Sequence, residues 1–218
     1  MATATISQLA RNIEIADQLR ARQGTEFEPQ DLPEPFGRVV RAIDRILESK
    51  DIPAVLCGDW AVWRYADPCR LSDDLDIASP ADRIGQFLEE AAVSGFEMLP
   101  AKTGRWPKLM HRETKVQVDI LPEGARPGTA NHLAPTTIPH PSKMGAISGK
   151  LGYVTLPRLI ELKLAAGRPQ DEADVVALLR ANEGQITQLR AHVAGIHADY
   201  VAAFDRLAKP AVDLRDDR

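Results

Sequence analysis

Two aspartates separated by one residue are the first side chains whose type and spacing suit chemistry. In the segment 73–77, Asp-Asp-Leu-Asp-Ile, a β-strand would place Asp74 and Asp76 on one face and Leu75 and Ile77 on the other. Two carboxylates on one face repel each other unless solvent or a cation separates them, and carboxylate oxygens are ligands that Mg²⁺ and Mn²⁺ prefer. The pair predicts a metal site, with a solvated strand end as the alternative.

A third aspartate follows in a second alternating segment. In 115–120, Lys-Val-Gln-Val-Asp-Ile, the apolar residues would face the core and Asp119 the polar side. If this strand lies beside the first, the three carboxylates could hold one or two divalent ions, the latter about 3.5 to 4 Å apart, as in in-line phosphoryl transfer. An exposed strand acid is the alternative for Asp119 on its own.

A turn between a short apolar segment and a helix offers a site for phosphate. Residues 52–57 form the apolar segment, Gly58-Asp59 breaks it, and 60–65 has the pattern of a helix. A helix start presents unpaired N–H groups and a positive dipole end, and Gly58 permits close approach. An ordinary strand-to-helix turn is the alternative, in which Asp59 caps the helix.

One lysine falls where a buried face is expected. Positions 156, 159, 160, 163 and 164 share a helical face, and only Lys163 among them is charged. A buried lysine needs a partner, which a triphosphate or an acidic cluster would supply, unless its stem reaches to solvent. The next helix carries Asp171 and Asp174 near its start, where acids ordinarily favour the helix dipole.

The remaining polar and aromatic candidates are weaker. Trp106 could stack on a substrate such as RNA or be a half-buried aromatic. His111, His132 and His140 have no zinc spacing and are expected at the surface. Cys57 and Cys69 are expected as reduced thiols, with Cys57 a small buried hydrophobe.

Periodicity predicts the elements that must position these side chains. Helices are predicted over 3–22, 36–49, 60–65, 81–92, 157–166, 170–180, 183–192 and 196–207, and strands over 52–57, 75–78, 96–99, 109–111, 115–121 and 151–155. The stretches 25–35 and 122–148 are predicted as a connector and a long surface loop, the latter able to cover the site.

The pattern favours an α/β (α+β) fold with a small mixed sheet flanked by helices. We divide the chain into an N-terminal helical segment, an α/β core and a C-terminal helical part, over 1–50, 51–155 and 156–212. The tail 213–218 is expected to fray.

Composition is that of an ordinary globular protein. The chain is 44% hydrophobic and 27% charged with a net charge of −4, which argues against broad attraction to nucleic acid but allows one basic groove. The sequence has neither an apolar run of membrane-spanning length nor a secretory signal pattern at its start, so we expect no membrane partner and a cytoplasmic location.

Two segments together resemble a known family. Ile-Pro-Ala-Val-Leu-Cys-Gly-Asp-Trp-Ala-Val at 52–62 and Arg-Leu-Ser-Asp-Asp-Leu-Asp-Ile at 70–77 are similar to the nucleotidyltransferase superfamily, whose fold is like that of DNA polymerase beta, and more narrowly to AbiEii-like toxins paired with antitoxins. The family pattern Arg-x-Thr-x-Asp-x-Asp is matched in order by Arg70, Ser72, Asp74 and Asp76. Asp119, followed by Ile-Leu, matches the third metal carboxylate.

The resemblance extends into the helical C-terminal part and covers about 52–179. The stretch 162–175 is similar to a signature of Lys-Leu-x-Ala, a basic residue, Asp, and a later Asp-Val, in which the lysine is associated with the nucleotide and the acids with the active-site wall. The family's second small residue in the turn is here Asp59, whose charge would repel a triphosphate.

The resemblance implies Mg²⁺- or Mn²⁺-dependent transfer of a nucleoside monophosphate from an NTP to an acceptor hydroxyl. Asp74 and Asp76 would hold the ion at the phosphates, Asp119 would bind a second ion and favour deprotonation of the acceptor, and Lys163 would neutralise developing charge. The residues implied in nucleotide binding are Gly58, Asp59, Arg70, Ser72, Lys163, Asp171 and Asp174.

Three alternatives stay open for the acceptor and the activity. The acceptor could be tRNA, with the chain a toxin held by a cognate antitoxin, or a small molecule of the aminoglycoside type. Asp59 favours a third possibility, a catalytically silent member that serves as a binding or regulatory protein.

Overall fold

A mixed β-sheet is the centre of the molecule. The computed structural model describes residues 2–22, 27–68, 70–100, 106–129 and 132–213, and in these the main sheet has six strands in the order β3-β4-β5-β2-β1-β8. β2 runs parallel to β5 and β1 parallel to β8, and the other neighbours are antiparallel. The strands are β1 (Ala54–Leu56), β2 (Asp74–Ser79), β3 (Phe96–Met98), β4 (Lys108–His111), β5 (Gln117–Pro122) and β8 (Leu151–Tyr153).

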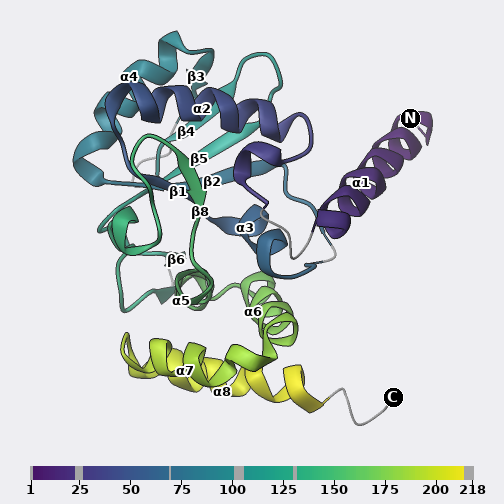
Figure 1. Ribbon diagram of the computed structural model, residues 1–218, viewed down its shortest axis with the longest axis vertical. Helices are drawn as coiled ribbons and strands as arrows, with labels where there is room; N and C mark the ends of the chain where they lie inside the picture. Colours follow the sequence, from purple (N-terminus) through teal and green to yellow (C-terminus); the bar gives the residue numbers. More distant parts are fainter. Residues whose placement is uncertain (1, 23–26, 69, 101–105, 130–131, 214–218) are drawn as a thin grey trace.

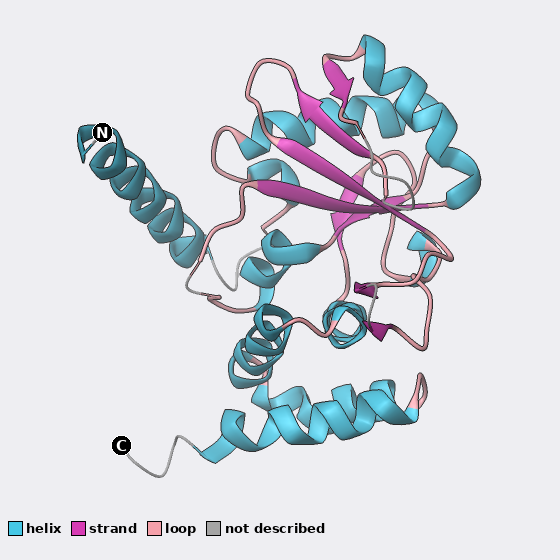
Figure 2. Ribbon diagram, turned by 180° about the vertical axis from the view of Figure 1, so that it is seen from behind, coloured by secondary structure: helices cyan, strands magenta, loops and turns pink. Residues whose placement is uncertain are grey.

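Helices cover both faces of this sheet, as the sequence predicts. Figure 1 shows α2 and α4 on one side and α3 and α5 on the other, with α7 and α8 forming a further layer beyond α5. Figure 2 shows the same layers from behind. The α-helices are α1 (Ala2–Arg22), α2 (Phe36–Lys50), α3 (Gly58–Tyr65), α4 (Ile84–Val93), α5 (Leu156–Ala166), α6 (Pro169–Ala181), α7 (Ile186–Ala194) and α8 (Ala198–Asp213).

Two apolar clusters hold the layers together. One lies between the sheet and α2 and α4, and the other joins α3 and the sheet to α5 through α8. Because the strands alternate, Leu75, Ile77 and Ile120 enter the first cluster. The acids between them therefore point to the opposite side, toward α5 and α6, which confirms the predicted alternation.

The prediction that 122–148 is a surface loop is wrong in that part of the stretch has regular structure and part is buried. The stretch contains a short ladder, β6 (Gly128–Thr129) with β7 (His132–Leu133), and a 3-10 turn at Pro141–Lys143. Ala134, Ile138 and Met144 from this stretch are buried in the second cluster. The stretch lacks a period because single residues, rather than a regular face, enter the core.

Smaller differences concern individual residues. His111 is buried, with 7% of its surface exposed, because its ring packs against Phe96 and bonds Thr114, so the predicted surface position is wrong. Cys57 is a buried free thiol as expected, while Cys69 and residues 214–218 of the tail lie outside the described residues. Among the described residues, no helix is long and apolar enough to cross a membrane.

Candidate active site

A pocket of about 610 Å³ lies between the sheet and helices α3, α5 and α6. Nine of the predicted site residues line it, and the tenth, Asp174, lies behind Lys163 as its ion-pair partner. Residues far apart in the sequence therefore meet here. The nine are Gly58, Asp59, Arg70, Ser72, Asp74, Asp76, Asp119, Lys163 and Asp171.

The strand carboxylates, Asp74, Asp76 and Asp119, form one wall of the pocket. Asp76 and Asp119 are register partners on the adjacent parallel strands β2 and β5, and Asp74 lies two residues from Asp76 on the same face. The Ser72 hydroxyl donates to the Asp74 carboxylate at 2.5 Å. The predicted neighbourhood of the two strands is confirmed.

Gly58 lies directly against this wall. Its φ is +63°, and a Cβ atom there would lie 2.0 Å from Oδ2 of Asp76. Any side chain would therefore both strain the backbone and collide with the carboxylate. The glycine lets the start of α3 approach Asp76, while the predicted close approach of a phosphate at this turn stays a prediction.

Asp119 already has partners on the sheet. Lys108, its register partner on β4, contacts Oδ2 at 2.5 Å, and the Gln117 side chain donates to Oδ1 at 2.8 Å. In the part of the chain that the structure describes, no three His, Cys, Asp or Glu side chains are arranged as a ready metal centre. In the described structure the cation that pairs with Asp119 is therefore the ammonium group of Lys108.

Asp76 is in an electrostatically unfavourable environment. Burial, followed by the negative charges of Asp74 and Asp119, raises the pKa of Asp76 to about 7, although Lys163 acts in the opposite direction. Near neutral pH this carboxyl is only partly ionised, and a cation beside it would favour the ionised form.

The helix carboxylates, Asp59, Asp171 and Asp174, form the opposite group. Asp59 belongs to α3 and the other two to α6. Lys163 of α5 lies at their centre, 5% exposed, with Nζ at 2.8 Å from Asp59, 3.3 Å from Asp171 and 2.7 Å from Asp174. An acidic cluster is therefore the partner that the buried lysine needed.

Two arginines complete this cluster. Arg70 binds both oxygens of Asp174 and reaches Asp59 at 2.9 Å. Arg168, at the start of α6, donates from Nε and Nη2 to Asp171. Three acids and three bases are thus joined in one network that ties α3, α5, α6 and the segment before β2 together.

Asp59 does not cap α3, contrary to the capping alternative. It is the second residue of the helix, and its carboxylate binds Lys163, Arg70 and the Gln170 side chain. Burial alone would raise the pKa of Asp59, but the charges of Lys163 and Arg70 outweigh burial and lower it. Asp59 is therefore a neutralised member of the cluster.

Sequence reasoning missed some of the residues that contact the site. Lys108, Gln117 and Gln170 were not singled out as partners of the acids, although Gln117 shares the polar face of Asp119. Arg168 enters the sequence analysis only as the unnamed basic residue of the stretch 162–175. The position of Lys108 opposite Asp119 depends on strand pairing, which no local pattern reveals.

Among known proteins, only solved structures show a likeness to this chain, at low sequence identity. No family model and no curated protein matches it. Solved structures with some likeness include a crystal structure of ANT(2'')-Ia in complex with adenylyl-2''-tobramycin, with 15% identity over 79% of this chain and 97% of the other and a TM-score of 0.40. A solution structure of the antibiotic-resistance factor ANT(2'')-Ia has 11% identity, coverage of 83% and 94%, and a TM-score of 0.41.

A crystal structure of JHP933 from Helicobacter pylori has 15% identity over 83% of this chain and 93% of the other, with a TM-score of 0.35. Likenesses at this level carry no argument about function. The narrower AbiEii-like resemblance stays a prediction.

Proposed function

We propose that this protein is a metal-dependent nucleotidyltransferase that moves a nucleoside monophosphate from an NTP to an acceptor hydroxyl. The observation that carries the proposal is the pairing of Asp76 with Asp119 on adjacent parallel strands, with Asp74 on the same face of a pocket of about 610 Å³. Gly58, at the start of α3, lies against the Asp76 carboxylate, and the N–H groups of this helix start would bind a phosphate. A cytoplasmic location belongs to the same proposal.

The donor set fits a divalent cation. The ligands would all be carboxylate oxygens; burial, followed by the charges of Asp74 and Asp119, raises the pKa of Asp76, and Mg²⁺ or Mn²⁺ beside it would favour its ionised form. Asp74 and Asp76 would hold the ion, and Asp119 would join them when Lys108 releases it. When bound, the ion would offset charge on the phosphate oxygens and make the phosphorus a better electrophile.

The chain's own residues would orient and deprotonate the reactants. Ser72 would keep the Asp74 carboxylate directed into the pocket, as its hydrogen bond does here. The acceptor oxygen would form a bond to the α-phosphorus while the bond to the departing pyrophosphate breaks, and the hydroxyl proton would pass to Asp119. Lys163 would hold the helix carboxylates, and with them α3, α5 and α6, in place beside the pocket.

Label transfer from each α-labelled NTP tests this proposal. Wild type, the double variant D74A/D76A and the control D82A, an exposed acid outside the pocket, would be incubated with Mg²⁺ and total RNA or small polyhydroxylated acceptors such as aminoglycosides. Wild type and D82A are expected to label an acceptor and the double variant to lose at least 100-fold. Equal labelling by the double variant would contradict the assignment.

The two acceptor classes give different outcomes in this assay. Labelled RNA would support a tRNA-directed toxin, which a cognate antitoxin would have to restrain. A labelled small molecule would support an aminoglycoside-type transferase.

A catalytically silent binding protein is the second candidate. It is supported by Asp59, which occupies the place of a small residue and engages Lys163 and Arg70. It predicts that Mg²⁺ and an NTP bind the wild type, as measured by calorimetry, while no acceptor is labelled.

A further inference from the structure

An anionic substrate in the pocket needs a cation with free N–H groups. Among the described lining residues, three are lysine or arginine: Arg70, Lys163 and Arg168. Their side chains differ in how many donors their own carboxylates already use. The inference below rests on the proposed function and asks which of the three is left to contact phosphate.

Lys163 has no donor left. Its ammonium group has three N–H bonds, and its Nζ lies within 3.3 Å of a carboxylate oxygen of each of the three helix carboxylates. Its side chain is only 5% exposed, so a phosphate could reach it only by displacing an aspartate. Burial lowers the pKa of Lys163, but the three carboxylates outweigh it and raise the pKa, which keeps the group charged and paired.

Arg70 is little better placed. Both of its terminal nitrogens bind aspartates, Nη1 and Nη2 with Asp174 and Nη2 also with Asp59. The remaining nitrogen, Nε, is buried and has no hydrogen-bond partner. Only one terminal N–H of Arg70, on Nη1, is not used by a carboxylate, and it belongs to a nitrogen that already binds Asp174, so Arg70 offers a phosphate fewer donors than an exposed guanidinium group would.

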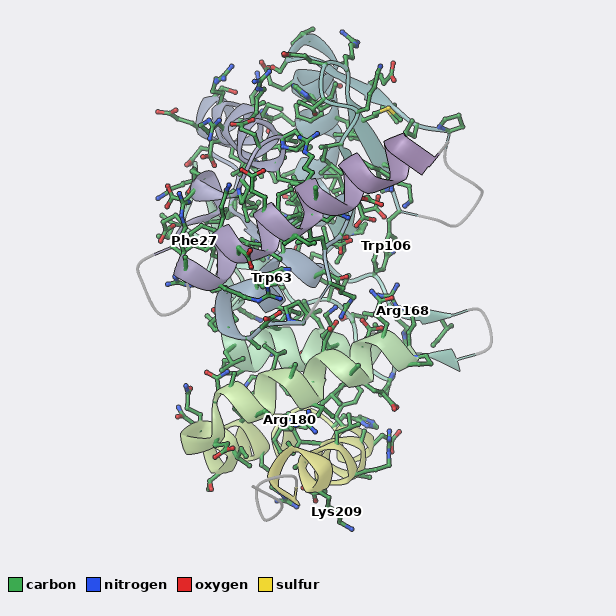
Figure 3. The ribbon with its side chains drawn as sticks, turned by 90° about the vertical axis from the view of Figure 1, so that its right-hand side faces the viewer. Phe27, Trp63, Trp106, Arg168, Arg180 and Lys209 are labelled. Carbon is green, nitrogen blue, oxygen red and sulfur yellow. The ribbon has the colours of Figure 1, made fainter. Side chains whose placement is uncertain are left out.

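Arg168 is the exposed cation of the three. Its side chain is 59% exposed, while Nε and Nη2 are anchored on Asp171, which is itself buried. Among the described residues Nη1 makes no hydrogen bond, so that end of the guanidinium group remains available. Figure 3 shows Arg168 beyond the start of α6 on the same side of the molecule as Trp106, and both residues line the pocket.

We infer that Arg168, anchored by Asp171, is the side chain that binds the phosphate groups of the substrate, while Lys163 is a structural residue that holds the helix carboxylates together. The anchoring matters because a guanidinium group already fixed on one side loses less freedom when it binds a phosphate. The role that the family resemblance gives to Lys163 thereby moves to Arg168.

Binding of phosphate groups, rather than turnover, tests this inference. Calorimetry with magnesium tripolyphosphate and with each magnesium NTP would compare wild type, R168Q and R168K. R190Q is the matched control, because Arg190 is also half exposed and also binds an aspartate, Asp205, through Nε and Nη2, but lies on α7 away from the pocket. Tripolyphosphate has no base or sugar, so it reports the phosphate contact alone.

The expected result is a 10-fold or greater rise in the dissociation constant for R168Q, a smaller rise for R168K, and none for R190Q. The slope of affinity against salt concentration should also fall in R168Q, which a purely structural role at the start of α6 would not produce. Circular dichroism and the unfolding midpoint show whether the variant is folded.

Two other results overturn the inference in different ways. If wild type binds a magnesium NTP and folded R168Q binds it equally well, the inference fails while the proposed function stands. If wild type binds neither tripolyphosphate nor any NTP, the proposed function fails and this inference with it.

Discussion

The pocket contains two groups of three aspartates that differ in their surroundings. The helix carboxylates meet three cations, Lys163, Arg70 and Arg168, whereas among the residues that the structure describes the strand carboxylates form one ion pair, between Asp119 and Lys108. Lys163 and Arg70 outweigh burial and lower the pKa of Asp59, whereas burial, followed by the charges of Asp74 and Asp119, raises the pKa of Asp76 to about 7. The same residue type therefore stabilises the fold on one side of the pocket and opposes it on the other.

The contrast assigns a structural role to the helix carboxylates and a candidate role in binding a cation or substrate to the strand carboxylates. The helix carboxylates are neutralised inside the molecule and connect α3, α5 and α6, so they need nothing from outside. The strand carboxylates leave negative charge uncompensated, which is the condition under which a bound cation or substrate gains most. Four changes to single groups or to the medium test the comparison, from the largest expected effect to the smallest.

Removing Lys163 should have the largest effect. Lys163→Met leaves three mutually repelling carboxylates without their central cation, and breaking such a buried network costs about 3 to 5 kcal/mol. Urea unfolding at pH 7 measures the loss. The control is Lys150→Met, an exposed lysine 3.4 Å from Glu28, which should change stability by less than about 0.5 kcal/mol. If the two variants lost equal amounts of unfolding free energy, Lys163 would not be the cation that stabilises the helix carboxylates.

Neutralising Asp76 should increase the stability of the protein, whereas removing Lys163 should decrease it. A folded-state pKa of about 7 against an ordinary 3.8 means that the folded protein holds this proton more tightly, so Asp76 costs stability as pH rises from 4 to 7. In metal-free buffer at pH 8, Asp76→Asn should raise the free energy of unfolding by about 2 to 4 kcal/mol. Near pH 4 the gain should almost vanish.

The measurement is urea unfolding of both proteins at several pH values with a chelator present. The control is Asp59→Asn, which removes a neutralised acid and should lower stability at pH 8. If Asp76→Asn were less stable than the wild type at that pH, ionised Asp76 would not be destabilised by burial and by the neighbouring strand carboxylates.

Added magnesium should stabilise the wild type moderately. A ligand at ten times its dissociation constant contributes about 1.4 kcal/mol to the folded state. The unfolding midpoint in excess MgCl₂ at pH 8 should therefore rise in the wild type and remain unchanged in D74N/D76N. Sodium chloride of equal ionic strength is the control, since general screening would act on both proteins.

Removing Lys108 should change stability least. The Lys108–Asp119 pair is partly exposed, 30% and 16%, so Lys108→Met should cost less than about 1 kcal/mol. The same variant should bind Mn²⁺ more tightly, because Asp119 is then released to the other strand carboxylates. Mn²⁺ titration followed by paramagnetic resonance measures this, and weaker binding than in wild type would contradict the idea that Lys108 competes with a metal.

Much of the fold could be predicted because it depends on local pattern. The alternation in 73–77 and 115–120 placed Leu75 and Ile77 in the core and Asp74 and Asp76 opposite them, because side chains alternate along any strand. The division of the chain into three parts stays a prediction.

The unpredicted features come from single residues at long range. Lys108 meets Asp119 because β4 joins β5 in one particular register, and His111 is buried because it pairs with Phe96 of β3. The loop 122–148 sends Ile138 and Met144 into the core without any period. None of these contacts leaves a repeating signal in the sequence.

The sequence by itself determined that three aspartates would stand on the polar faces of two strands and that Lys163 would lie on a buried helix face. Those results follow from the periods of strand and helix, which are properties of the backbone. Only the tertiary structure decided which acid meets which base, because ion pairing depends on distances of a few ångströms between residues such as Asp59 and Lys163, which are 104 residues apart in the sequence. That distribution made one group of aspartates a structural cluster and left the other with uncompensated charge.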